Sequence, residues 1–245
     1  MKLIIKKIIN EISPNHFKLL AQYVEVCFST TSSKAVRILD IGGGSGEYWA
    51  SDQKLKRYLE SQKIEVLIMD AHIPELNLNR NIRFVSGLAP SALNDFENES
   101  FDLVVAFDVI EHLKKEDGYL LLYHMERIAK SASLIFTPNG FLYQQPDPGN
   151  QFNAHVSGWT PHELKKFGWD KIYGHGGLRQ FFGSYGLPKR DFTIQLLHNS
   201  WILLLLLSQI IVFKIPRLSF SFSAVKLKRA NLPRILLSRI NRIEE

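Results

Sequence analysis

The chain has 245 residues, 45% hydrophobic and 22% charged, a composition typical of a globular protein. Its single cysteine, Cys27, excludes an internal disulfide framework and fits a reducing compartment. The formal net charge is +6, but residues 1–213 carry 22 basic and 22 acidic side chains, whereas residues 214–245 carry 8 and 2. The excess of basic side chains therefore lies in residues 214–245. It indicates a local basic appendage and argues against a broad nucleic-acid-binding face.

The N-terminal residues 1–30 are predicted to form two short helices separated at Pro14, because apolar residues recur there at helical spacing. Cys27 lies in the apolar stretch YVEVCF and is predicted to be a buried structural thiol. Lys6 and Lys7 interrupt the first apolar run, and no small-residue cleavage site follows, so this segment does not resemble a signal peptide. We therefore expect a cytoplasmic protein.

Five short apolar runs are predicted to be buried strands, over 35–41, 64–70, 81–87, 100–108 and 133–139. Helices are predicted over 45–62 and 115–132, and a shorter one follows Thr160, with Thr160 as N-cap, Pro161 in the first turn and Glu163 as capping-box partner. This alternation predicts a doubly wound, mostly parallel α/β sheet of the Rossmann-like kind, with helices on both faces.

Residues 170–177 and 190–197 are expected to supply two further strands, which would make seven, although GHGG at 174–177 taken alone is typical of a flexible loop. The chain is thus divided into one domain over 1–197, with its core at 35–197, and a hydrophobic and basic appendage over 198–245.

Four glycines, Gly42, Gly43, Gly44 and Gly46, lie between the first predicted strand and the following helix. That turn belongs to the carboxyl edge of the sheet, where open α/β folds bind ligands, and missing side chains let a ligand approach the backbone amides. A phosphate-binding P-loop is excluded because no Gly-Lys-Ser/Thr follows. A dinucleotide fingerprint is disfavoured because Glu47 or Trp49 occupies its last position.

The pattern Asp40-x-Gly42-x-Gly44-x-Gly46 resembles motif I of the class I S-adenosylmethionine-dependent methyltransferases, as in the type 11 and type 12 methyltransferase domains. Asp70 at the end of VLIMD and the stretch FDLVVAFDVIEHL extend the resemblance, which covers roughly residues 30–185. It implies S-adenosylmethionine as cofactor, with Asp40 and the glycine loop, including Gly43 and Ser45, around its aminoacyl end. Asp70, followed by Ala71, would accept bonds from the ribose hydroxyls.

Two further cofactor contacts are implied by the same resemblance. Phe107 and Asp108 would line the methionine side of the bound cofactor. The acidic residue that the family often places after its third strand is missing here, so Leu88 or a backbone group would contact the adenine.

His112 and His155 are the candidates for a catalytic base, which is needed only if the acceptor must lose a proton. Tyr143, Asn153, His155 and Trp159, in the long loop after the fifth strand, are candidates for substrate binding. Asp108, Glu111 and His112 would suit a metal, but because no further ligand is apparent we expect none.

The apolar run WILLLLLSQIIVF, residues 201–213, is too short to cross a bilayer comfortably. Either it is a core or homodimer-interface helix, or it lies in a membrane surface together with the basic continuation to residue 242, on the inner face of the membrane.

We therefore expect an enzyme that methylates a small molecule, a lipid-like compound or a glycan intermediate, and no nucleic acid. A non-catalytic, membrane-attached cofactor-binding scaffold and, less favoured, an NAD-dependent oxidoreductase are the alternatives.

Overall fold

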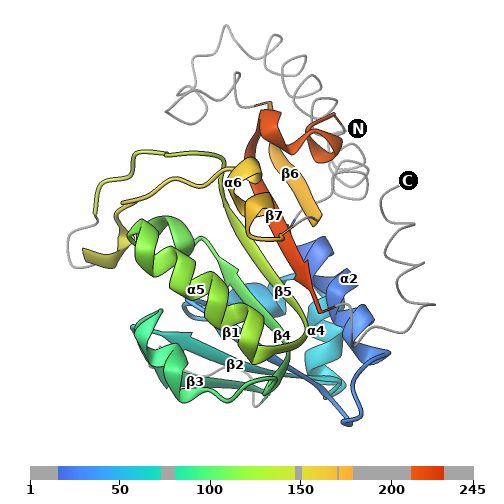
Figure 1. Cartoon of the computed structure of the whole chain (residues 1–245). Coiled ribbons are helices and arrows are strands. Elements are labelled where there is room, and N and C mark those ends of the chain that lie inside the picture. The colour runs from blue at the N-terminus through green and yellow to red at the C-terminus, as the bar shows by residue number, and fades with distance from the viewer. Residues whose placement is uncertain (1–15, 73–80, 147–150, 170, 179–210, 229–245) are drawn as a thin grey trace, which may run out of the picture.

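A computed structural model describes residues 16–72, 81–146, 151–169, 171–178 and 211–228 (Figure 1). One sheet runs through it in the order β3-β2-β1-β4-β5-β7-β6. Its strands are β1 Val36–Ile41, β2 Ile64–Asp70, β3 Ile82–Ser86, β4 Phe101–Phe107, β5 Ala129–Pro138, β6 Lys171–Leu178 and β7 Ser219–Leu227. Neighbouring strands from β3 to β5 pair in parallel, and β7 pairs antiparallel with both β5 and β6. The predicted seven-stranded, mostly parallel sheet is therefore confirmed.

Helices cover both faces of the sheet (Figure 1). On one face lie α2 His16–Phe28, α3 Glu47–Ser51 and α4 Gln53–Glu60; on the other lie α5 Lys115–Ile128 and α6 Pro161–Lys166. Single 3₁₀ turns are η1 Ser91–Asp95, η2 Ile110–His112, η3 Gln151–Asn153 and η5 Pro216–Leu218. Each face has its own apolar core, as a doubly wound sheet requires.

The helix predicted over 45–62 is two helices, because Asp52 interrupts it. The Asp52 backbone is extended, and its carboxylate accepts hydrogen bonds from the amides of Lys54 and Leu55 at 2.9 and 3.0 Å. Asp is a preferred N-cap because its side chain satisfies amides that the first helical turn leaves free. The predicted helix over 115–132 also ends early, at Ile128, and Ala129 pairs with Phe101 as the first residue of β5.

The predicted C-terminal limit of the domain, residue 197, is wrong, because β7 comes from the segment treated as an appendage. Residues 219–227 lie between β5 and β6 and supply buried side chains to the sheet, among them Phe222 and Ala224. The expected strand at 190–197 lies outside the described residues. GHGG at 174–177 belongs to β6 and is not a loop, since His175 is buried and its Nε2 contacts Ser223 Oγ at 2.9 Å.

The end of the apolar run, residues 211–213, packs on the domain. Val212 is buried, and the Phe213 ring lies 5.1 Å from that of Tyr173 on β6. Residues 201–210 and 229–245 lie outside the described residues. Within the described part of the chain, no helix has both the length and the hydropathy to span a bilayer.

Candidate functional site

The glycine loop follows β1 at the carboxyl edge of the sheet and forms one wall of a cavity of about 320 Å³. Gly44, with φ +54°, has open space where a side chain would project, whereas a side chain at Gly43 would collide with the carboxylate of Asp40. The Gly44 amide donates to Asp70 Oδ2 at 2.9 Å, which ties the loop to the end of β2. The predicted residues Asp40, Gly42, Gly43, Gly44, Ser45, Phe107 and Asp108 all line this cavity. Gly46 does not, and its φ of +71° serves the turn into α3.

Asp40 is the buried charge of this cavity. Its Oδ2 accepts hydrogen bonds from the Tyr48 hydroxyl at 2.5 Å and from Trp49 Nε1 at 2.7 Å, while its Oδ1 is buried and has no partner within the protein. Burial raises the pKa of Asp40 to about 6, the two hydrogen bonds lower it in part, and the charge of Asp70 raises it further. An acceptor oxygen left free at a cavity wall suits a cationic ligand group such as an ammonium.

Aromatic side chains that the sequence analysis missed complete the cavity. His16 and Phe17, at the start of α2, line it together with Tyr48. The Phe17 ring stacks on Tyr48 at 5.2 Å, and His16 stacks on Phe136 at 4.2 Å. Burial, with a smaller contribution from His175, lowers the pKa of His16 to about 4, so this ring is neutral at pH 7. Tyr48 could have been inferred from its place in the first turn after the loop, but tertiary packing alone brings His16 and Phe17 here.

The residues predicted to contact ribose and adenine do not line this cavity. Asp70 ends β2, where its two oxygens accept the Gly44 and His72 amides. Ala71 follows, half-buried. Leu88 is 48% exposed, and its carbonyl accepts the Ala92 amide. A ribose contact at Asp70 and an adenine contact at Leu88 stay predictions.

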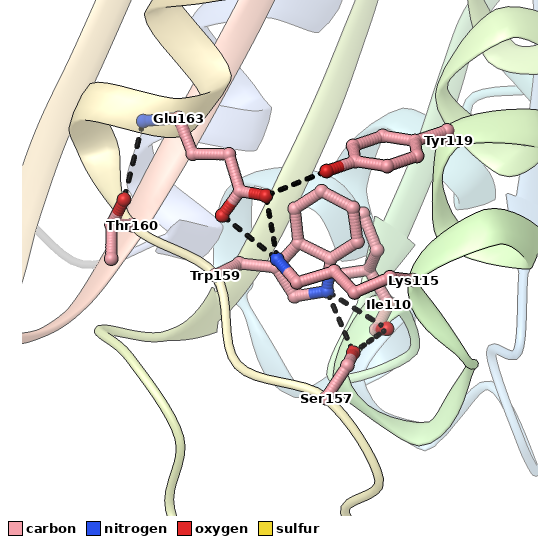
Figure 2. A network of polar contacts seen from close by, with 7 residues as sticks. All are labelled: Ile110, Lys115, Tyr119, Ser157, Trp159, Thr160 and Glu163. Carbon is pink, nitrogen blue, oxygen red and sulfur yellow. Dashed lines mark hydrogen bonds and ion pairs between the residues drawn. The ribbon is translucent and has the colours of Figure 1, made fainter.

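The long loop after β5 is pinned to η2 by carbonyl groups (Figure 2). The Ile110 carbonyl accepts Trp159 Nε1 and Ser157 Oγ, both at 3.2 Å. The Glu111 carbonyl accepts the amides of Val156 and Ser157 at 2.9 and 3.0 Å. These bonds place the loop residues 154–157 beside the end of β4.

Trp159 is fully buried, with Lys115 Nζ 3.6 Å from the ring centre and Gly118 against its edge. Lys115 also pairs with Glu163, which accepts a bond from Tyr119 at 2.9 Å (Figure 2). The structure therefore gives Trp159 a packing role in place of the predicted substrate contact. The predicted cap of α6 is confirmed, because Thr160 Oγ1 accepts the Glu163 amide at 3.2 Å, but the Glu163 carboxylate binds Lys115 instead of completing a capping box.

Pinning the loop brings the two predicted catalytic histidines together. The rings of His112 and His155 lie 4.7 Å apart, and Glu111 offers a carboxylate oxygen to the same cluster. Burial lowers the pKa of His112, which the Ala154 carbonyl partly offsets. Burial and the charge of neighbouring Asp108 raise the pKa of Glu111 to about 8. Neither histidine lines the glycine-loop cavity, but Asp108, which does, lies next to this cluster.

The other predicted substrate residues, Tyr143 and Asn153, adjoin Leu142 and Ala154, whose carbonyls contact the two histidines. Tyr143 is 63% exposed. The backbone and side-chain oxygens of Asn153 accept bonds from Gln144 at 2.9 and 2.8 Å. A substrate contact at either residue stays a prediction.

One family model is similar to the centre of the chain. Residues 39–137 match the family model described as a methyltransferase domain. This match spans β1 to β5 and so includes the glycine loop, Asp70, Asp108 and Glu111. A comparison with curated proteins returned no match.

Solved structures with a similar arrangement include an S-adenosylmethionine-dependent methyltransferase of Archaeoglobus fulgidus. It is 19% identical, the alignment covers 86% of this chain and 94% of that one, and the TM-score is 0.49. Another is phosphoethanolamine N-methyltransferase 2 of Haemonchus contortus in complex with S-adenosyl-L-methionine. It is 18% identical, with 84% and 52% of the two chains covered and a TM-score of 0.43.

Proposed function

We propose that the chain is a class I S-adenosylmethionine-dependent methyltransferase that methylates a small-molecule, lipid or glycan acceptor by in-line displacement. The match of residues 39–137 to a methyltransferase domain supports this proposal. The observation that carries the proposed site is the free oxygen of buried Asp40 beside a glycine loop that leaves open space at Gly44. The ammonium of an amino-acid group suits this acidic lining, and a pyrophosphate does not, because Glu47 and Asp40 both line the cavity.

S-adenosylmethionine supplies a methyl group on a positively charged sulfur. Asp40 and the loop amides would hold the aminoacyl end, and the aromatic side chains of His16, Phe17 and Phe107 line the rest of the cavity. Since the leaving sulfur becomes a neutral thioether, positioning supplies much of the acceleration, and the chain needs no covalent nucleophile.

Calorimetry with S-adenosylmethionine, S-adenosylhomocysteine and NAD tests the site. We expect the first two to bind and NAD to show no heat, which would also remove the oxidoreductase alternative. Gly44→Ala places a methyl group in the open cavity and should weaken binding at least tenfold. Gly176→Ala is the matched control, because Gly176 also has a positive φ, +74°, and lies on β6 away from the cavity. Equal affinity of the two variants would contradict the site.

The acceptor is identified by incubating cell extract with methyl-labelled S-adenosylmethionine and the enzyme, followed by separation of the labelled products into water-soluble, lipid and glycan fractions. A lipid product would also support membrane attachment.

We propose that the basic C-terminal segment attaches the enzyme to anionic membranes. Truncation at 197 is a poor test of that attachment because it removes β7. Exchange of Arg234, Arg239 and Arg242 for Gln leaves β7 in place, and flotation with anionic vesicles should then decrease; unchanged flotation would remove the membrane proposal.

A further inference from the structure

Glu111, His112 and His155 bring three metal-ligating groups to one point next to the cavity. One ligand atom from each side chain lies within 4.8 Å of the other two. Donor atoms about 2.1 Å from a zinc-sized cation lie roughly 3.4 Å apart, so small side-chain rotations would close this triangle on an ion. Two of the ligands are neighbours in η2, and the third arrives on the pinned loop after β5.

Backbone carbonyls orient both imidazole rings for this purpose. His112 Nδ1 lies 3.0 Å from the Ala154 carbonyl, and His155 Nδ1 lies 2.7 Å from that of Leu142. Because a carbonyl only accepts, each Nδ1 carries the proton, and each Nε2 of the neutral ring keeps its lone pair. A hydrogen bond from the other ring nitrogen to a carbonyl fixes the orientation of a histidine that binds a metal.

The Glu111 carboxylate has one satisfied and one free oxygen. Thr137 Oγ1 donates to Oε2 at 3.0 Å, whereas Oε1 is buried without a partner in the protein. Glu111 itself is only 2% exposed. A buried polar oxygen without a partner is costly, and a cation held with two imidazoles would supply that partner.

We propose that Glu111, His112 and His155 bind a divalent first-row metal ion, and that its open positions hold a hydroxyl-bearing acceptor beside the methyl donor. One carboxylate and two imidazoles suit Mn²⁺, Fe²⁺, Co²⁺ or Zn²⁺. Asp108, which lines the cavity three residues before Glu111, lies where the two sites meet. This inference rests on the proposed methyltransferase activity for the acceptor's role, but not for metal binding.

The chemistry of such a site is O-methylation. Coordination lowers the pKa of a hydroxyl, as it does that of water, so the acceptor oxygen releases its proton to solvent. That oxygen then forms a bond to the methyl carbon as the carbon–sulfur bond breaks, and the sulfur leaves as a neutral thioether. Charge balances because the proton released replaces the positive charge lost from sulfur.

The test uses the full-length protein stripped with a chelator and titrated calorimetrically with MnCl₂, CoCl₂ or ZnCl₂ alone. We expect one site, weakened roughly 100-fold by Glu111→Gln and by His155→Gln. The matched control is His162→Gln, an exposed histidine on α6, which should bind like the wild type. Spin-echo modulation from imidazole nitrogen should appear in the Mn²⁺ spectrum and weaken in His112→Gln.

Calorimetry with S-adenosylmethionine on the same samples separates this inference from the proposed function. The variants should keep their affinity for it within about threefold, which also shows that they are folded. Absence of binding of all three metals at about 1 mM would overturn the metal site, as would equal metal binding by the wild type, Glu111→Gln and His155→Gln. Metal binding without binding of S-adenosylmethionine would leave the metal site standing and remove the methyltransferase.

Discussion

At the scale of single residues, Asp40 shows a conflict between ligand binding and stability. Its carboxylate is buried with two donors on one oxygen and none on the other, and its pKa is raised to about 6. The charged form is therefore less favourable in the folded chain than in the unfolded chain. A binding site that needs this charge carries a stability cost whenever its ligand is absent.

Asp40→Asn should weaken ligand binding and increase the stability of the folded chain. We expect affinity for S-adenosylmethionine to fall at least tenfold at pH 7.5, while the free energy of unfolding rises by roughly 2 kcal/mol because no charge is buried. The sign follows from the raised pKa: the folded wild type binds the proton more tightly, so it gains stability as pH falls from about 6 towards 4. The advantage of the variant should therefore shrink at pH 5.

Urea unfolding at pH 5 and pH 7.5 measures this difference. Asp95→Asn, at an exposed position, is the control and should change little at either pH. A loss of stability of equal size at both pH values in Asp40→Asn would contradict the interpretation of Asp40 as a buried, disfavoured charge.

The residues that sequence could identify lie at or just after strand ends. Asp40 is near the end of β1, the glycines follow β1 and Asp108 follows β4, so their positions at the carboxyl edge follow from the fold. His16 and Phe17 reach the cavity only because α2 packs across the sheet. A loop tryptophan amid polar neighbours, such as Trp159, resembles a substrate contact in sequence, and only the bonds to Ile110 and the space at Gly118 show that it is part of the core.

At the scale of elements, α5 and the loop before α6 fit together through a single glycine. A side chain at Gly118 would overlap the six-membered ring of Trp159. The helix therefore has a glycine here, despite its low helix propensity, because only a glycine leaves room for the indole. The same indole holds the loop that carries His155, which makes this contact a support of the candidate site.

Gly118→Ala should therefore destabilise the protein by about 1–2 kcal/mol, because overpacking outweighs the gain of roughly 1 kcal/mol in helix propensity. Denaturant unfolding monitored by circular dichroism gives the value. In a Trp159→Phe background the smaller ring leaves room, and the penalty should disappear or change sign. A penalty that persists there would mean that something other than the indole resists the methyl group.

At the scale of the whole molecule, β7 joins the last described segment to both cores of the sheet. Phe222 is fully buried in the core that contains α5, and the β7 residues Ala224 and Ser223 pair with both β5 and β6. The sequence did not predict this strand, because SFSFSAVKL lacks a Val/Ile run and residues 139–218 separate it from the end of its partner β5, at Pro138. Periodicity reports local structure, whereas this pairing is set by distant segments.

Phe222→Ala should cost about 3–5 kcal/mol, the usual loss for a buried aromatic side chain. Tryptophan fluorescence and far-ultraviolet circular dichroism should report the same shifted midpoint, since Trp49 and Trp159 lie on opposite faces of one sheet. Phe141→Ala, at a 53% exposed position, is the control. Separate transitions for the two signals would show that β7 and β6 form a unit independent of the rest.

The late position of β7 has a consequence for biosynthesis. When the ribosome has made β5, the nascent chain must still be extended through residues 139–218 before the partner of β5 exists. At about 5–20 residues per second this takes on the order of 4–16 seconds, during which the backbone groups at that edge have no neighbour. The growing polypeptide is thus open to wrong pairing for seconds, and we expect its yield to depend on chaperones that shield it.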